Sequence, residues 1–179
     1  KQPAMTYEQA QRALQAGIDL VGEMKEKGYQ IILTGEMGIG NTTASTAMSC
    51  TLLGFAPEEL TGRGAGLSDV GLLRKKNAIE RALSVNRPDS NDPVDVLAKV
   101  GGLEIAGMAG AFLGSVKHRV PVVIDGVISA VAALVAARIC PEAKDFMLPS
   151  HMSREPAALR IMDELELKKL LLNYVGGFR

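Results

Sequence analysis

Residues 29–43 read YQIILTGEMGIGNTT. The opening run, residues 29–33, is rich in the β-branched and aromatic residues that favour a strand. We expect a helix to begin at Thr42 or Thr43 and to end at Gly54, which leaves a glycine-rich turn (residues 35–40) between strand and helix. At such a turn, backbone N–H groups and the positive end of the helix dipole can hold an anion. The segment therefore predicts a strand–turn–helix unit with an anion site at the turn.

The rest of the chain continues this alternation. A first helix is expected up to Lys27, with Thr6 and Gln9 as its capping box and Gly28 just past its end. Further helices are expected at 67–83, 102–117, 127–138 and from about 153, strands at 120–124 and 146–148, and a loop at 86–93. The small residues of 102–117 are expected to let that helix pack closely against the sheet. Strands that alternate with helices indicate an α/β fold with a parallel sheet.

The composition excludes several functional classes. A length of 179 residues suggests a single domain over residues 1–179, and 47% hydrophobic residues can supply a sizeable core. Twenty Lys and Arg balance twenty Asp and Glu, and 4% of residues are aromatic, so the chain lacks the basic excess and the stacking surface of a nucleic-acid binder. No apolar run approaches the roughly 18 residues of a membrane span. We therefore expect a soluble protein with no nucleic-acid or membrane partner.

The cysteines and histidines give little sign of special chemistry. Cys50 and Cys140 lie in apolar runs, so we expect buried, reduced thiols in a cytoplasmic protein. The two histidines, His118 and His151, have no Cys–His spacing of the kind that binds zinc. We expect no metal site and no cofactor.

The spacing of the residues in the glycine-rich turn restricts the class of ligand that the turn could bind. Gly35-x4-Gly40-Asn41-Thr42 matches a nucleotide P-loop except that Asn41 stands where the lysine belongs. Without that ammonium the turn suits one phosphate better than a polyphosphate. The basic cluster at 74–76 could supply a cation, although three basic residues in a row more often form a solvated face. A tight turn that needs a positive φ and binds nothing remains an alternative.

Two carboxylates are candidates for the same site. Glu36 lies inside the turn, where it can accept neighbouring backbone N–H groups or contact a ribose or a developing positive charge. Asp125 follows the strand at 120–124 and either caps the next helix or borders the crevice at the carboxyl ends of the strands.

Six blocks, in one order along nearly the whole chain, resemble the nicotinate-nucleotide:dimethylbenzimidazole phosphoribosyltransferase family. They are GEMGIGNTT at 35–43, TGRGAGL at 61–67, LRKK at 73–76, VGGLEIA at 100–106, VIDG at 123–126 and SHMSRE at 150–155. The resemblance implies a Rossmann-like three-layer α/β domain, with a mostly parallel sheet flanked by helices, in a homodimer. It implies transfer of the phosphoribosyl group of nicotinate mononucleotide to 5,6-dimethylbenzimidazole. The products would be nicotinate and α-ribazole 5′-phosphate, a precursor of the lower ligand of cobalamin.

The resemblance also implies roles for individual residues. The residues that would hold the 5′-phosphate are Gly38, Ile39, Gly40, Asn41 and Thr42, with Lys75 as the cationic partner of the phosphate. Glu36 would face the reacting ribose and base in a supporting catalytic role, and Asp125 and Ser153 would line the nucleotide pocket.

The general base of the family is a glutamate in an Arg-Leu-Gly-Glu-Gly segment that would follow Arg179. With that segment and the family's N-terminal part both absent, we expect the chain to be cut at both ends. We then expect it to bind the mononucleotide weakly and to turn over poorly or not at all. The alternatives are a degenerate P-loop nucleotide-binding module or kinase, and a regulatory domain that binds a nucleotide without chemistry.

Overall fold

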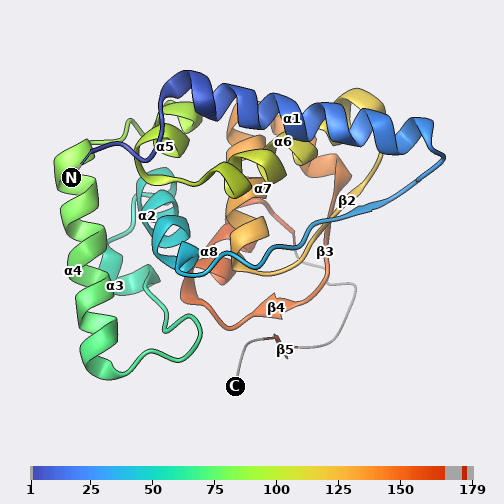
Figure 1. Ribbon diagram of the computed structural model, residues 1–179. Coiled ribbons are helices and arrows are strands. Elements are labelled where there is room, and N and C mark those ends of the chain that lie inside the picture. The colour runs from blue at the N-terminus through green and yellow to red at the C-terminus, as the bar shows by residue number, and fades with distance from the viewer. Residues whose placement is uncertain (1, 168–174, 177–179) are drawn as a thin grey trace.

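The structure is a computed structural model that describes residues 2–167 and 175–176 (Figure 1). Its elements are α1 (Tyr7–Glu26), β1 (Ile32–Leu33), α2 (Asn41–Leu53), α3 (Pro57–Leu60), α4 (Asp69–Asn86), α5 (Pro93–Val100), α6 (Leu103–His118), β2 (Val122–Ile124), α7 (Val127–Ile139), the 3-10 helix η1 (Pro141–Phe146), β3 (Met147–Pro149), β4 (Met152–Ser153), α8 (Pro156–Glu164) and β5 (Val175–Gly176).

A parallel sheet with the strand order β1-β2-β3 lies at the centre of the fold. Ile32 pairs with Val122, and Val123 pairs with Leu148. All three residues of β2 are buried, and α6 and α7 both contact β2 and each other. These findings confirm the predicted α/β class with a parallel sheet and flanking helices. Because the strands are parallel, the segments that follow β1, β2 and β3 leave the sheet at the same edge.

Helix α1 begins and ends as predicted. The Thr6 hydroxyl accepts a hydrogen bond from the Gln9 N–H, and the Gln9 side chain accepts one from the Thr6 N–H, so the capping box is present. Gly28, just past the end of the helix, has φ +90. This is the left-handed conformation that glycine adopts at little cost.

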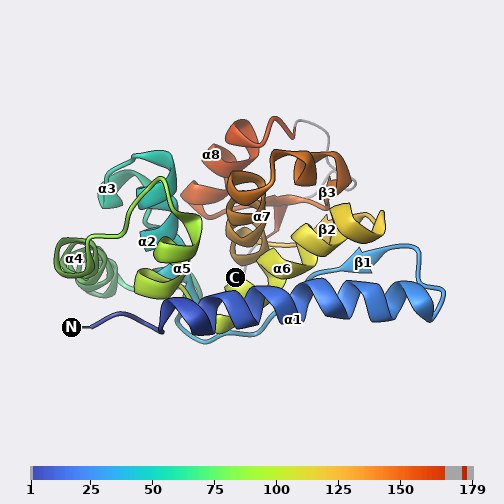
Figure 2. The ribbon, with the colours of Figure 1, turned by 90° about the horizontal axis from the view of Figure 1, so that it is seen from above.

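The long contact between α1 and α6 depends on glycines (Figure 2). A Cβ added at Gly17 would lie 2.0 Å from the Gly107 carbonyl oxygen, and one added at Gly110 would lie 2.0 Å from the Leu14 carbonyl oxygen. The expectation that the small residues of α6 face the sheet is therefore wrong for these glycines, which face α1. They let two helix backbones approach more closely than any side chain would permit.

Several elements differ from the expectation. The helices α3 and α5 and the 3-10 helix η1 were not expected; α3 and α5 are four and eight residues long, and each begins at a proline. The helix expected from about residue 153 begins at Pro156, because β4 precedes it. Cys50 is buried as expected, whereas Cys140 is only partly buried.

Candidate functional site

The glycine-rich turn follows the carboxyl end of β1 and leads directly into α2. Gly40 is the N-cap of α2 with φ +85, and no side chain caps the helix. The N–H of Asn41 donates to the Gly38 carbonyl oxygen at 3.4 Å, and the N–H of Thr43 donates to the Gly40 carbonyl oxygen at 3.1 Å. Within the described residues, the N–H groups of Gly40 and Thr42 have no acceptor. The first turn of α2 therefore presents unsatisfied donors at the positive end of its dipole.

The Glu36 carboxylate folds back onto its own turn. Its Oε2 accepts from the Gly38 N–H at 2.5 Å and from the Asn41 side-chain amide at 2.5 Å. The same amide lies 3.4 Å from Glu104 Oε1. Glu36 was expected either to accept hydrogen bonds from neighbouring N–H groups or to contact a ribose or a positive charge. The structure shows the first of these arrangements. A phosphate that used the Gly38 N–H would have to displace this carboxylate.

Lys75 reaches the turn from α4. Its side chain is 6% exposed, and its Nζ donates to Thr42 Oγ1 at 2.9 Å and to the Gly62 carbonyl oxygen at 3.0 Å. An ammonium has three donors, so one is left for a ligand. Burial lowers the pKa of Lys75, and the Glu155 carboxylate opposes that shift. Of the basic cluster, Lys75 is thus directed inward to Thr42, one of the residues predicted to hold the phosphate, whereas Arg74 is exposed and Lys76 half-buried.

A third segment, residues 62–64 (the 62–64 loop), joins Lys75 to the residues after β3. Glu155 Oε1 accepts from the Gly64 N–H at 2.8 Å, and the Glu155 N–H donates to Ser153 Oγ at 3.3 Å. A Cβ added at Gly62 would lie 2.1 Å from Glu155 Oε2, so a larger residue there would displace the Glu155 carboxylate. The sequence interpretation missed Glu155 and this loop as parts of the site. The alternating glycines of TGRGAG at 61–66 were the available signal.

Asp125 belongs to a separate group at the carboxyl end of β2. Its side chain is 60% exposed, and its Oδ1 lies 4.0 Å from His151 Nδ1. The Ser150 hydroxyl donates to the Asp125 carbonyl oxygen at 3.3 Å. The N-cap of α7 is Gly126, with no side-chain cap, so the interpretation of Asp125 as a helix cap is wrong. Its carboxylate is available at the edge where the strands end.

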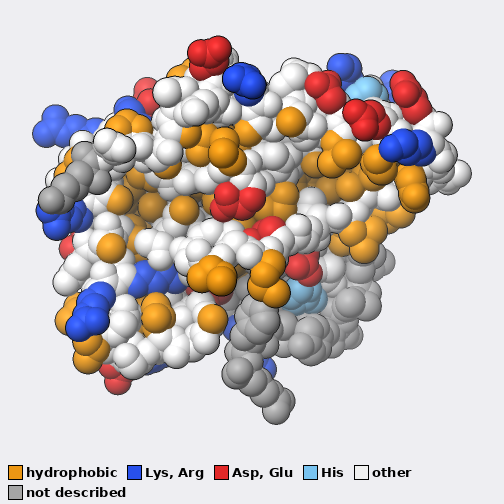
Figure 3. All heavy atoms as spheres, viewed as in Figure 1, with side chains coloured by type: hydrophobic (Ala, Val, Ile, Leu, Met, Phe, Trp, Pro, Cys, Tyr) orange, Lys and Arg blue, Asp and Glu red, His pale blue; other side chains and the backbone are white. Residues whose placement is uncertain are grey.

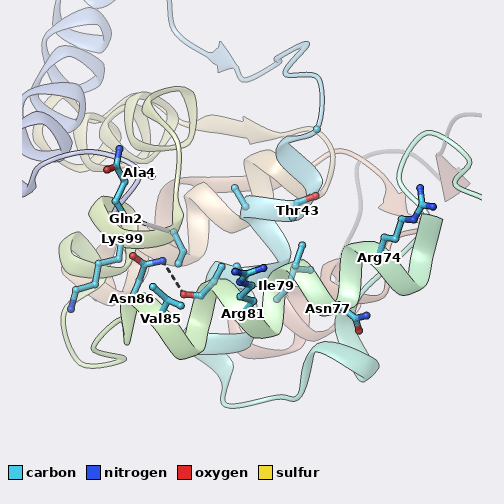
Figure 4. Close-up of a pocket in the computed structure, with 16 residues that line it drawn as sticks. Gln2, Ala4, Thr43, Arg74, Asn77, Ile79, Arg81, Val85, Asn86 and Lys99 are labelled. Atoms are coloured by element: carbon cyan, nitrogen blue, oxygen red, sulfur yellow. Dashed lines mark hydrogen bonds between the residues drawn. The ribbon is translucent and has the colours of Figure 1, made fainter. Parts of the chain in front are cut away.

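A groove of about 750 Å³ opens beside the turn, between α2, α4 and α5 (Figure 4). Gly40 and Thr43 line its end near the turn, and Arg74, Arg81 and Lys99 contribute basic groups. The predicted site residues Asn41, Lys75, Asp125 and Ser153 are not among its lining residues. The groove therefore adjoins the predicted phosphate site and shares only Gly40 with it.

Two exposed carboxylates lie at the turn: Glu36 within it, and Glu104, whose Oε1 is 3.4 Å from the Asn41 amide. Acidic side chains cross the middle of the face seen in Figure 3. An anion that binds beside them needs a cation to offset the repulsion, and the inward Lys75 ammonium is that cation.

Within residues 2–167 and 175–176, no helix combines the length and the apolar character that crossing a membrane requires. The same residues contain no group of three or more His, Cys, Asp or Glu side chains placed to hold a metal ion.

The comparisons with known proteins agree with this arrangement. A family model described as a phosphoribosyltransferase matches residues 1–174. The nicotinate-nucleotide–dimethylbenzimidazole phosphoribosyltransferase of Ruminiclostridium cellulolyticum is 49% identical over 172 residues, which cover 96% of this chain and 49% of that protein. The enzyme of the same name from Acetivibrio thermocellus is 50% identical over 171 residues, with 96% and 49% covered.

A solved structure gives the same result. The crystal structure of CobT from Thermus thermophilus superposes with a TM-score of 0.89 at 40% identity, over 96% of this chain and 51% of that one. The chain spans about half the length of these relatives. Matches that cover almost the whole chain at this identity establish that it belongs to the nicotinate-nucleotide–dimethylbenzimidazole phosphoribosyltransferase family.

Proposed function

We propose that this protein transfers the phosphoribosyl group of nicotinate mononucleotide to 5,6-dimethylbenzimidazole. The products are nicotinate and α-ribazole 5′-phosphate, which enters the lower ligand of cobalamin. The names of relatives about half identical to this chain support the reaction. The observation that carries it is the contact of the buried Lys75 ammonium with Thr42 in the first turn of α2. That contact sets one cation beside free backbone donors, which suits one phosphate.

The 5′-phosphate is proposed to bind at the turn. The residues that hold it are Gly38, Ile39, Gly40, Asn41, Thr42 and Lys75. The unsatisfied N–H groups of Gly40 and Thr42, together with the third donor of Lys75, support this assignment. The Glu36 carboxylate leaves the Gly38 N–H when the phosphate arrives.

The sugar and base are proposed to lie toward the carboxylates. Positive charge builds on C1′ as nicotinate leaves, and a nearby carboxylate such as Glu36 stabilises such a charge. Asp125 and Ser153 line the nucleotide pocket; Asp125 follows β2, and Ser153 lies in β4, shortly after β3. The general base that takes the benzimidazole proton is proposed to be the glutamate of the Arg-Leu-Gly-Glu-Gly segment that the family resemblance places after Arg179.

The protein is further proposed to act in the cytoplasm as a homodimer, as the family resemblance implies. Sedimentation velocity of the chain tests the dimer. A single monomeric species at micromolar concentration would contradict that part of the proposal.

The P-loop alternative is not supported. The relatives that match this chain are named as phosphoribosyltransferases. Asn41, which stands in the position of the P-loop lysine, is hydrogen-bonded to Glu36. The cation of this site is instead Lys75 of α4, whereas a P-loop carries its lysine within the loop itself.

Calorimetric titration with nicotinate mononucleotide, run beside Mg·ATP, tests the proposed ligand. We expect heat of binding with the mononucleotide and none with Mg·ATP. Binding of Mg·ATP alone would reject the phosphoribosyltransferase site and restore the P-loop interpretation.

Turnover tests the proposed reaction. Formation of α-ribazole 5′-phosphate is measured for this chain and for a chain extended at both ends to the length of the relatives. We expect activity in the extended chain, because it carries the proposed general base. Equal activity of the two would refute the proposed position of the general base.

A further inference from the structure

We propose that Glu155 is a positioning residue that holds the 62–64 loop by a hydrogen bond and, through its negative charge, keeps the Lys75 ammonium in place for a phosphate. The inference rests on the proposed phosphate site and goes beyond it, because Glu155 is not one of the residues assigned to that site. Glu155 acts through the loop and through Lys75, without touching the ligand.

Glu155 and Lys75 act on the same short segment from its two ends. The carboxylate accepts from the Gly64 N–H at 2.8 Å, while Lys75 donates to the Gly62 carbonyl oxygen at 3.0 Å. Lys75 also donates to Thr42, so the loop is the link between Glu155 and the first turn of α2. A change at Glu155 is thereby transmitted to the ammonium that faces the turn.

The Glu155 carboxylate does not serve as a helix cap, although Glu155 stands at the N-cap position of α8. Glu155 is the N-cap of α8, where a side chain would ordinarily accept the helix's own first N–H groups. It makes no such bond and gives its carboxylate to the loop instead. Its own N–H donates to Ser153 Oγ, which anchors the residue from the other side.

The loop is shaped to receive this carboxylate. At Gly62, a Cβ would collide with Glu155 Oε2 at 2.1 Å. At Gly64, which has φ +55, a Cβ would lie 3.0 Å from Thr42 Oγ1 and 3.8 Å from Lys75 Nζ. The two glycines therefore bring the backbone into contact with both charged groups and with α2.

Lys75 needs a nearby negative charge. It is buried, its two hydrogen-bond partners are neutral, and it forms no ion pair within the part of the chain that the structure describes. Burial lowers the pKa of Lys75, and Glu155 raises it. Arg63, which lies between the two glycines of the loop, pairs with Asp69. Loss of Glu155 would leave an ammonium that gives up its proton more easily and that binds phosphate only at lower pH.

The substitution Glu155→Gln separates this role from a purely structural one. A glutamine oxygen still accepts from the Gly64 N–H, so the loop stays in place while the charge is lost. Glu155→Ala removes both. Asp163→Asn is the matched control, because it removes one exposed carboxylate from the same helix α8 without touching the loop.

Two readouts are taken on the intact chain over a range of pH. The first is the titration of the Lys75 side chain by NMR, with the signal assigned by its absence in Lys75→Met. The second is the Kd for nicotinate mononucleotide. We expect Glu155→Gln to lower the Lys75 midpoint by about one pH unit or more. We also expect it to shift the alkaline loss of binding by the same amount, while Asp163→Asn changes neither.

A Glu155→Gln chain that titrates and binds as the unchanged protein does, beside a defective Glu155→Ala chain, would overturn the inference. If the unchanged chain binds no mononucleotide, the proposed function fails, and the Lys75 titration alone then judges Glu155. An unchanged titration midpoint of Lys75 in Glu155→Gln would reject the coupling between Glu155 and Lys75, and a lowered midpoint would support it.

Discussion

The interface between α1 and α6 and the turn before α2 are both built on glycine, but the glycines lie in opposite surroundings. At Gly17 and Gly110, an added Cβ would meet the backbone of the facing helix at 2.0 Å. At Gly40, an added Cβ would meet nothing within 4 Å, and the backbone has φ +85. In the interface, glycine permits two backbones to touch. In the turn, it permits a conformation that opens the N-terminus of α2 to solvent, which is where a ligand can bind.

The largest expected effect breaks the interface. Gly110→Ala would set a Cβ 2.0 Å from the Leu14 carbonyl oxygen, and α1 would have to move away. We expect the free energy of unfolding to fall by about 3 kcal/mol, in the upper range for overpacking. Urea denaturation measures the change.

Gly107→Ala is the matched control on the same helix. Its Cβ would lie 4.0 Å from the nearest atom, the Ala13 carbonyl oxygen, so no clash arises. We expect a gain of about 0.5–1 kcal/mol, because alanine favours a helix over glycine. Equal unfolding free energies of Gly107→Ala and Gly110→Ala would contradict the close backbone contact between α1 and α6.

The next effect concerns the turn and leaves the interface alone. Lys75→Met keeps the length and the apolar stem of the side chain but removes the ammonium that contacts Thr42. We expect a folded protein whose Kd for nicotinate mononucleotide rises by about tenfold or more, since hydrogen bonds to charged groups contribute about 1.5–3 kcal/mol. Calorimetry measures the Kd.

Lys76→Met serves as the comparison at the adjacent, half-buried position. We expect its Kd to stay close to that of the unchanged chain. An equal loss in both variants would mean that the general charge of α4, rather than the inward position of Lys75, governs binding.

A smaller effect tests the backbone of the turn. Gly40→Ala meets no steric obstacle, but it places a Cβ at φ +85. We expect a cost of about 1–2 kcal/mol in stability from the left-handed conformation. Gly35→Ala, which also meets nothing within 4 Å and has no positive φ, should cost less. Thermal unfolding of the two variants distinguishes conformational strain from lost space.

The smallest effect is a pH dependence of stability that arises from Lys75. Because burial lowers its pKa below the usual 10.5, the unfolded chain binds more protons than the folded chain between the two values. Stability contributed through this group therefore rises with pH across that window. The difference in unfolding free energy between the unchanged chain and Lys75→Met should grow toward alkaline pH. A difference that shrinks would mean that the folded protein favours the charged lysine.

Much of the local structure of the site could be predicted from sequence, because its signals are local. The strand–turn–helix order at 29–43 and the capping box of Thr6 and Gln9 depend on residues within a few positions of each other. The direction of Lys75 could not be predicted, because the cluster at 74–76 has the composition of a solvated face. Its burial results from packing against Thr42, 33 residues earlier, and against the 62–64 loop. The spacing of the α6 glycines likewise predicts close packing but does not identify α1 as the partner.

The most direct test of the account is an amide NMR titration of the chain with nicotinate mononucleotide. If the glycine-rich turn and the 62–64 loop form the phosphate site, the amide signals that shift most should be those of Gly38, Gly40 and Thr42, followed by Gly62 and Gly64. The amides of Gly17 and Gly110, in the closed interface, should stay where they are. Shifts confined to the groove between α4 and α5, or the absence of any shift at the turn under saturating ligand, would contradict the account.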